Sequence, residues 1–479
     1  MATRRLALVF PDFEGLPLAY RKHIAPLGAL VLASLTPPDY EVVFFDGRHM
    51  TIPHDLEADV VAISAMTPQI PEAYRLADLF RKRKIPVVMG GAHTSLVPEE
   101  ALAHADAVVV GEAEGLWGTV LEDVSAGRSR GAYVCLHKPS LSDMPYPRHD
   151  LLSSDDYLPI RSIQITRGCP LNCEFCAVPK NFGREYRVRP LDEVIGEIAS
   201  LSEYLYFVDD NLMIKRRMFR RLFETMTEMD RRWTGMAPLS IASDRKYVDL
   251  LARSGCWSMY VDVGPWISVG LKKDVSSLGE QVGKYLDYIA VLQDAGIKVM
   301  GSFIFGFDHD TESIFDVTLE FLNKSGIVEA EFLILTPYPK TPLYEKLALQ
   351  GRIIDEDWGR YNTRHAVFRP KQMAPEQLEE GVEYVWREFY RRNSWVDHSL
   401  EVDCPANETH KKLMAAVPNL FRDQVQRAIL KTIRDRGEDV RRLSGDDLTD
   451  IWRHHDMPII WKIVEGAVTE GMLELDIDV

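Results

Sequence analysis

Short, almost wholly apolar runs repeat along the first quarter of the chain, with segments of helical spacing between them. The runs are residues 5–10, 41–46, 59–65, 86–91 and 106–112, and the helical segments lie around 26–36, 70–83 and 97–104. A strand that is apolar at every position needs cover on both faces, which a parallel sheet between two layers of helices provides. Residues 1–125 are therefore predicted to form an α/β, doubly wound, Rossmann-like domain.

A second alternation of strand and helix patterns occupies residues 161–370. Its strand candidates are 161–166, 204–210, 238–243, 258–264, 299–307 and 330–338, and its clearest helices are 190–201 and 280–296. Six such units are fewer than the eight of a closed barrel, so this part is predicted to be a partial (β/α)6 barrel of TIM type. Residues 126–160, rich in Pro, Ser and Asp, are expected to be a linker. Residues 371–479 are expected to be a small helical region that ends in a possible strand.

The charge and hydropathy of the chain narrow its partners and its location. The 479 residues carry a formal net charge of −16, which disfavours binding to the phosphate backbone of nucleic acid. No apolar run approaches the length of about 20 residues that a transmembrane helix needs. Pro11 and Asp12 interrupt the first apolar stretch, which argues against a signal peptide. We expect a cytoplasmic protein with no transmembrane segment and no nucleic-acid partner.

Three of the six cysteines fall within one short segment, at Cys169, Cys173 and Cys176. The others are scattered, which is not the pattern of a disulfide framework. The segment follows the first predicted strand of the barrel, so a loop carries the three thiolates. Three thiolates can hold a [4Fe–4S] cluster and leave its fourth iron open to another ligand. A structural zinc site is the alternative, although zinc normally takes four ligands in paired spacing.

The segment Cys169-Pro-Leu-Asn-Cys173-Glu-Phe-Cys176 resembles the signature of the radical S-adenosylmethionine (SAM) superfamily. The resemblance covers about residues 160–370. It implies that the three cysteines bind a [4Fe–4S] cluster, that SAM binds the open iron, and that SAM then releases a 5′-deoxyadenosyl radical. It also implies that Phe175 lies near the adenine of SAM.

Other strand ends of the barrel resemble the superfamily with varying fidelity. The second strand ends in Asp209-Asp210 where many members have glycines, and this departure resembles the subgroup with an N-terminal cobalamin domain. The resemblance implies that Asp209 and Asp210 contact SAM, as do Ser240, Asp262 and Ile304. Capping of the strand end is the alternative role for the two adjacent aspartates.

The strand ends of the first domain carry glycines and small polar residues, which let the backbone approach a bulky ligand. By itself this pattern indicates either a nucleotide-like ligand or tight turns in an inert domain. The motif Gly-Gly-x-His-x-Ser and the later Val-Val-Gly-Glu resemble cobalamin-binding domains fused to radical SAM barrels. The resemblance implies cobalamin contacts from Ser64, Met66, Thr67, Gly90, Gly91, His93, Thr94, Gly111 and Glu112.

The loop after the first strand differs from that of cobalamin proteins in which a histidine ligates cobalt. Such proteins carry Asp-x-His-x-x-Gly there, whereas residues 11–15 contain no histidine. We therefore expect cobalamin to bind without a histidine ligand to cobalt. Met66, Thr67 or Gln69 is expected to face the lower side of the cofactor, and His93 to orient a loop or contact the cofactor's periphery.

The resemblance implies a cobalamin-dependent radical SAM enzyme, in the first place a class B methyltransferase. One SAM would methylate the cobalamin, and a second would give the radical that removes hydrogen from an unactivated carbon of a small-molecule or lipid-like substrate. Oxidative cyclisation or rearrangement, for example of a tetrapyrrole, is the alternative. A tRNA methylthiotransferase fits less well, because residues 1–160 contain only Cys135 for a second cluster. An electron donor such as flavodoxin or ferredoxin is the implied partner.

Overall fold

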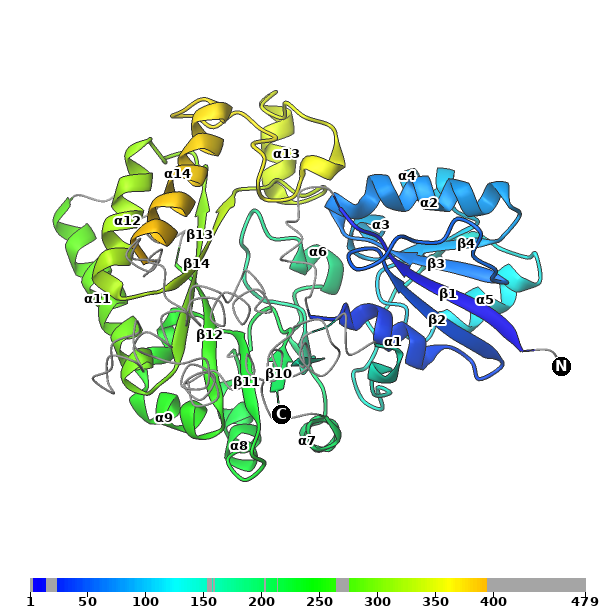
Figure 1. The fold of residues 1–479 in the computed structure, drawn as a ribbon, viewed down its shortest axis with the longest axis horizontal. Helices are drawn as coiled ribbons and strands as arrows, with labels where there is room; N and C mark the ends of the chain where they lie inside the picture. The colour runs from blue at the N-terminus through cyan, green and yellow to red at the C-terminus, as the bar shows by residue number, and fades with distance from the viewer. Residues whose placement is uncertain are drawn as a thin grey trace, which may run out of the picture. The chain divides into compact units, whose positions relative to one another are not determined.

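The computed structural model describes residues 3–13, 24–152, 157, 160–201, 204–212, 214–263 and 275–393, with the backbone alone at 275–281 and 391–393. Two six-stranded sheets lie in one compact unit, which comprises Met1–Gly15, Ile24–Ser153 and Ile160–Val385 (Figure 1). Of the helical region predicted at 371–479, residues 394–479 and the possible final strand lie outside the described residues.

The first sheet is entirely parallel. Its strands are β1 (Arg4–Phe10), β2 (Tyr40–Asp46), β3 (Val60–Ser64), β4 (Val87–Gly90), β5 (Ala107–Val110) and β6 (Gly131–Val134), in the order β2-β1-β3-β4-β5-β6. Its helices are α1 (Leu27–Leu35), α2 (Ile70–Lys82), α3 (Ala92–Leu96), α4 (Pro98–His104) and α5 (Trp117–Ser125). The strand order reverses between β1 and β3, where doubly wound sheets form their ligand-binding crevice. The predicted Rossmann-like fold is confirmed.

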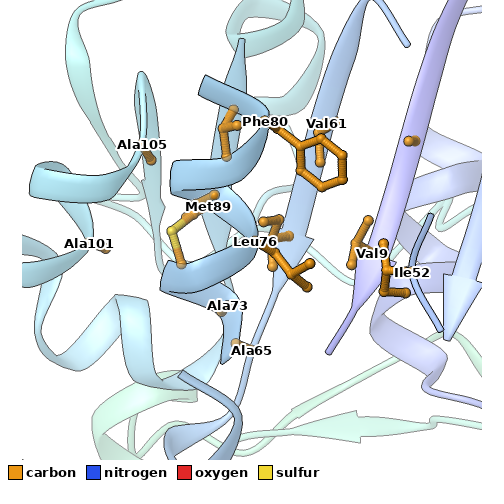
Figure 2. Close-up of a cluster of buried hydrophobic side chains, with 14 of the residues drawn as sticks. Val9, Ile52, Val61, Ala65, Ala73, Leu76, Phe80, Met89, Ala101 and Ala105 are labelled. Atoms are coloured by element: carbon orange, nitrogen blue, oxygen red, sulfur yellow. The ribbon is translucent and has the colours of Figure 1, made fainter. Parts of the chain in front are cut away.

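Both faces of this sheet are apolar because alternate side chains of each strand point to opposite sides. Val61 and Ile63 of β3 pack in one buried cluster with α2 and α4, whereas Val60 and Ala62 pack in another with α5. Figure 2 shows the first cluster, in which Phe80 of α2 points toward Val61. Phe80 is fully buried, and burying such a side chain stabilises a fold by roughly 1.5–3 kcal/mol.

The first sheet continues beyond residue 125, the predicted end of the domain. Strand β6 lies inside the segment 126–160 that is expected from its composition to be a linker, and it pairs with β5. The apolar pattern misses this strand because it is short and lies at the edge of the sheet. Only Tyr133 of its four residues is buried, so no continuous apolar run marks it.

The second sheet is also parallel. Its strands are β7 (Ile160–Ile163), β10 (Tyr204–Phe207), β11 (Arg232–Met236), β12 (Cys256–Asp262), β13 (Lys298–Phe305) and β14 (Glu329–Ile334), in the order β14-β13-β12-β11-β10-β7. The first and last strands lie at opposite edges, so the sheet is open, as predicted for a partial barrel. Helices α7 (Leu191–Ser200), α8 (Arg216–Met226), α9 (Arg245–Arg253), α11 (Val275–Asp294) and α12 (Ser313–Ser325) connect these strands (Figure 1).

Two further helices, α13 (Pro342–Leu349) and α14 (Pro375–Asn393), follow the last strand. In the described part of the chain, no helix combines the length and the apolar character needed to span a membrane.

The third barrel strand is not where the sequence analysis places it. Residues 238–243, expected to be a strand, instead form the 3-10 helix η4 (Leu239–Ser243) after Pro238. The strand is β11, six residues earlier in the chain. Its buried positions are Trp233 and Gly235, with the exposed Arg232 before them. An apolar-run criterion overlooks such a strand because glycine and arginine interrupt the run.

Candidate active site

The three clustered cysteines lie on a loop that two short strands close at its base. Strand β8 (Thr166–Arg167) pairs antiparallel with β9 (Arg187–Val188), and the loop between them contains α6 (Val178–Phe182). Gly168 begins this loop, which we call the cysteine loop, with a φ of 86°. A side chain at Gly168 would collide with the carbonyl oxygen of Glu185, so the entry to the loop requires glycine.

The three cysteines differ in exposure. Cys169 is buried, Cys176 is half-buried and Cys173 is exposed. The N–H of Cys176 donates to the carbonyl of Cys173 at 3.1 Å, which turns the chain between them. Burial raises the pKa of Cys176 to about 11, and the nearby carboxylate of Asp210 adds to the rise. Near neutral pH this thiol keeps its proton, so binding of a metal would have to release it.

The sequence leaves two kinds of metal centre open for the three cysteines, a cluster and a single zinc ion. Within the described ranges, no three His, Cys, Asp or Glu side chains converge closely enough to hold one metal ion. Zinc would need its thiolate ligands at about 2.3 Å from one centre. A cubane spreads its ligands further apart, because each thiolate binds a different iron. The assignment of Cys169, Cys173 and Cys176 to the cluster is compatible with the loop and stays a prediction.

The adjacent aspartates after β10 have different surroundings. Asp209 is fully buried, and its carboxylate accepts hydrogen bonds from the N–H of Ile165 at 3.1 Å and from the hydroxyl of Thr166 at 2.6 Å. These bonds tie the end of β10 to the base of the cysteine loop, which is the capping role given above as the alternative. Asp210 lines a cavity and is close enough to Cys176 to affect its pKa. Of the pair, Asp210 is therefore the better placed to contact SAM.

Two further predicted SAM contacts lie near the cysteine loop. Phe175 lines a cavity of about 270 Å³ with Phe307, which follows β13. Their rings meet edge to face with centroids 6.1 Å apart. Asp262 is the last residue of β12. It lies close enough to the cysteine loop to affect Cys173: burial raises the pKa of Cys173, and the charges of Cys169 and Asp262 add to the rise.

The other two predicted SAM contacts, Ile304 and Ser240, lie on β13 and in η4. Ile304 is half-buried on β13. Ser240 is exposed in η4, where its carbonyl accepts a hydrogen bond from Arg216 at 3.1 Å. Its expected place at a strand end is wrong, because the segment around it is not a strand.

A larger cavity, of about 580 Å³, opens at the carboxyl ends of the strands of the first sheet. We call it the sheet-edge cavity. Six predicted cobalamin contacts line it, namely Ser64, Met66, Gly90, Gly91, Gly111 and Glu112. Barrel residues also line it, among them Gln164, Arg167 and Asp210. Its volume lies within the range of about 300–1,000 Å³ that is usual for ligand sites.

The glycine loops of this cavity are built for close approach. Gly91 has a φ of 100°, and a side chain there would collide with the backbone of Ala65. The loop after β4 therefore passes over the end of β3 with no room for a Cβ atom. A broad, flat ligand can approach the backbone at such a place, so the cavity fits the cobalamin prediction.

Three predicted cobalamin contacts, Thr67, His93 and Thr94, are buried and are not among the residues that line the cavity. His93 Nδ1 lies 3.3 Å from Thr67 Oγ1, and its ring meets that of Trp358 edge to face at 5.2 Å between centroids. Burial lowers the pKa of His93 to about 4, so the ring is neutral near pH 7. His93 thus supports the loop after β3, one of the two roles expected for it.

The loop after β3 holds the residues that are expected to face the lower side of cobalamin. Met66 is exposed and lines the sheet-edge cavity. Thr67 and Gln69 are buried, and Gln69 Oε1 accepts a hydrogen bond from the N–H of Met66 at 2.9 Å. Of the three candidates, Met66 alone is placed by the loop at the cavity wall.

Two arginines at the base of the cysteine loop are not among the residues predicted from the sequence. Arg167 Nη1 lies 2.8 Å from Glu112 Oε2, and Arg187 Nη2 lies 2.7 Å from Glu112 Oε1. Burial alone would raise the pKa of Glu112, but hydrogen bonds from Arg187 and Arg167 hold it below its ordinary value. These partners are 55 and 75 residues from Glu112 in the chain, so no local pattern could pair them.

Known proteins resemble the chain over both sheets. Residues 24–120 match the family described as B12 binding domain, and residues 163–322 match the radical SAM superfamily. Bacteriochlorophyllide d C-12(1)-methyltransferase of Chlorobaculum tepidum is 30% identical over 379 residues, which cover 76% of this chain and 82% of that protein. Bacteriochlorophyllide d C-8(2)-methyltransferase of the same bacterium is 31% identical over 416 residues, which cover 82% and 92%. The chain belongs to the family of cobalamin-binding radical SAM methyltransferases.

A solved structure shares the fold of this radical SAM enzyme. The methyltransferase TsrM of Kitasatospora setae, solved with cobalamin and a [4Fe–4S] cluster, has a TM-score of 0.58 and 19% sequence identity, covering 73% of this chain and 78% of that one. Membership of the family means that the enzyme uses a [4Fe–4S] cluster, SAM and cobalamin, as the sequence analysis predicts, and that it takes a small-molecule substrate and needs a reductant.

Proposed function

We propose that this enzyme adds a methyl group to an unactivated carbon at the periphery of a tetrapyrrole-type macrocycle. The observation that carries the proposal is the sheet-edge cavity, which the glycine loops of the first sheet line together with Asp210 beside the cysteine loop. A methyl carrier at the glycine loops and SAM at the cysteine loop would therefore face one space. Such proximity is required, because the carbon becomes a radical when it loses hydrogen. That radical must receive the methyl group before another reaction consumes the radical.

The residues of the chain are proposed to hold and orient the cofactors. Cys169, Cys173 and Cys176 would bind three irons of the cluster, and Asp210 would accept hydrogen bonds from polar groups of SAM. When bound, the cluster and SAM supply the 5′-deoxyadenosyl radical, and cobalamin supplies the methyl group. Apolar side chains such as Val31 form much of the cavity wall, which keeps water away from the reacting groups.

Met66 is proposed to face the lower side of cobalamin, with no histidine bound to cobalt. The thioether sulfur of Met66 binds other groups only weakly through its electron pairs. The lower face of cobalamin would therefore have no strong ligand to cobalt. A Met66→His variant tests the placement. A new nitrogen ligand, seen in the absorption and paramagnetic resonance spectra of the bound cofactor, supports it. Unchanged spectra with cofactor bound would place Met66 elsewhere.

The substrate class rests on the two Chlorobaculum tepidum relatives. Their names assign them methylation at the C-12(1) and C-8(2) positions of bacteriochlorophyllide d. The alignments span 82% and 92% of the two relatives. We infer a chlorin-like substrate, a tetrapyrrole, which is the class that the sequence analysis associates with the alternative cyclase reaction.

The electron donor is proposed to be flavodoxin or ferredoxin in the reducing cytoplasm. Each turnover would need one electron for the SAM that is cleaved to the radical, and one more to return cobalamin to the state that accepts a methyl group. Both proteins deliver single electrons at low potential, which the chemistry of the cluster requires.

The experiment is an anaerobic incubation of the reconstituted enzyme with bacteriochlorophyllide d, a low-potential reductant such as reduced flavodoxin, and SAM that carries a deuterated methyl group. The expected product is the macrocycle with one deuterated methyl group at a former C–H position, detected by mass spectrometry. The Cys173→Ala variant serves as the control and should give none. Labelling of a hopanoid in a parallel incubation, with an unlabelled macrocycle, would overturn the substrate class. An oxidised, unmethylated macrocycle would indicate the cyclase reaction instead.

A further inference from the structure

A buried set of charged side chains connects the first sheet with the base of the cysteine loop. Glu112 follows β5, Arg167 ends β8 and Arg187 begins β9. The carboxylate of Glu112 contacts Arg167 Nη1 at 2.8 Å through Oε2 and Arg187 Nη2 at 2.7 Å through Oε1. Arg167 Nη1 also lies 2.6 Å from Glu114 Oε1, and Lys138 Nζ lies 3.6 Å from Glu112 Oε1.

The two arginines that contact Glu112 lie on either side of the cysteine loop. They lie on the paired strands β8 and β9, so one carboxylate holds both ends of the cysteine loop. Arg167 stands two residues before Cys169. Any displacement of Glu112 is therefore transmitted to the first predicted cluster ligand through a very short stretch of backbone.

The charged groups are almost completely removed from water. The exposed fractions of the side chains are 2% for Glu112, 8% for Arg167 and 9% for Arg187. Burying such charges costs desolvation energy that their attraction only partly returns, so an apolar contact would serve stability as well. What the charges add is a defined geometry, because a carboxylate between two guanidinium groups accepts hydrogen bonds in few orientations.

We propose that Glu112 is a positioning residue, which fixes the base of the cysteine loop against the carboxyl edge of the first sheet. Glu112 also lines the sheet-edge cavity, as does Arg167. The same contact thus sets the distance between the glycine loops and the cysteine loop. The inference rests on the proposed function only for the identity of the two cofactors that these loops hold.

This role has a consequence for the use of SAM. With the cysteine loop held in place, the carbon that loses hydrogen lies next to the methyl carrier. Without Glu112 the cysteine loop still contains its three cysteines, so radical formation continues while methyl transfer fails more often. The amount of 5′-deoxyadenosine formed for each methylated product should therefore rise.

The experiment compares amide hydrogen exchange in the full-length, anaerobically reconstituted wild type and Glu112→Gln enzymes. Peptides from residues 166–188 are expected to exchange about tenfold faster in the variant, since Arg187 loses its carboxylate partner and Arg167 keeps only Glu114. Glu114→Gln should give a smaller increase, because Glu114 contacts only Arg167 among the two arginines. Glu112→Asp, which keeps the charge, should restore part of the protection. Glu320→Gln, which breaks the exposed pair with Lys324, is the control and should change nothing in these peptides.

Arg187→Lys provides a second variant that keeps the positive charge but loses the forked geometry. It should also speed exchange in residues 166–188 and raise the ratio of 5′-deoxyadenosine to methylated product at unchanged iron content. It decides the matter if Glu112→Gln does not fold. Unchanged exchange and an unchanged ratio in the folded variants would overturn the positioning role. The exchange measurement needs no substrate, so a failed macrocycle assay with increased exchange would count against the proposed function alone.

Discussion

The substitution Asp209→Ala separates the two roles that the sequence leaves open for this residue. In the structure its carboxylate accepts hydrogen bonds from the buried N–H groups of Ile165 and Thr166. Alanine would leave both groups without an acceptor, at roughly 1–3 kcal/mol each, so the free energy of unfolding should fall by about 2–6 kcal/mol. Burial raises the pKa of Asp209 to about 7, which shows that the charge itself is costly there. Near pH 7 we therefore expect the fall in the free energy of unfolding to lie in the lower half of that range.

Urea titration of the wild type and the variant measures this difference, and SAM affinity is measured on the same samples. Asp192→Ala is the matched control, because Asp192 forms an exposed pair with Arg221 in the first turn of α7 and should change stability by no more than about 1 kcal/mol. Asp210→Ala should show the opposite pattern, with stability retained and SAM affinity reduced about tenfold or more. A variant of Asp209 that unfolds like the wild type but no longer binds SAM would refute the capping role.

Three further outcomes are expected. Cys173→Ala should reduce the iron content after reconstitution from about four per chain to less than about one, measured by iron and sulfide analysis; full iron content would contradict the ligand assignment. Gly91→Ala should lower the free energy of unfolding by at least about 1–3 kcal/mol and weaken cobalamin binding. The reason is that φ is 100° at this position and the new Cβ atom would collide with the backbone of Ala65. Normal retention of cobalamin would argue against a role of this loop in cofactor binding. Burial lowers the pKa of His93 to about 4 from an ordinary 6.5. The unfolded chain therefore binds the extra proton between these values, and the unfolding free energy falls by about 3 kcal/mol as the pH drops through that window. His93→Gln should lose this part of the pH dependence, and an unchanged slope would contradict the burial argument.

Much of the fold follows from local patterns in the sequence. The runs that contain Val60 to Ile63 are apolar at every position because α2 and α4 cover one face and α5 covers the other. Strands β6 and β11 escape the same criterion. Only Tyr133 is buried in β6, and Arg232 and Gly235 interrupt the apolar pattern of β11.

The site is predictable only where its residues are close together in the chain. The cysteine loop is one continuous segment, so spacing alone points to three iron ligands. The contact of Glu112 with Arg167 and Arg187 arises from residues far apart in the sequence, and only the packing of the fold brings them together. Asp209 and Asp210 are neighbours with the same side chain, and the direction in which each points decides which one caps the strand and which one lines the cavity.

The central claim is that a radical source and a methyl carrier act on one carbon in one cavity. The most direct measurement is the ratio of methylated product, S-adenosylhomocysteine and 5′-deoxyadenosine in a single reaction, with and without cobalamin. The account predicts roughly equal amounts of all three, and the loss of methylated product when cobalamin is left out. Methylated product formed without 5′-deoxyadenosine, or equally well without cobalamin, would contradict it.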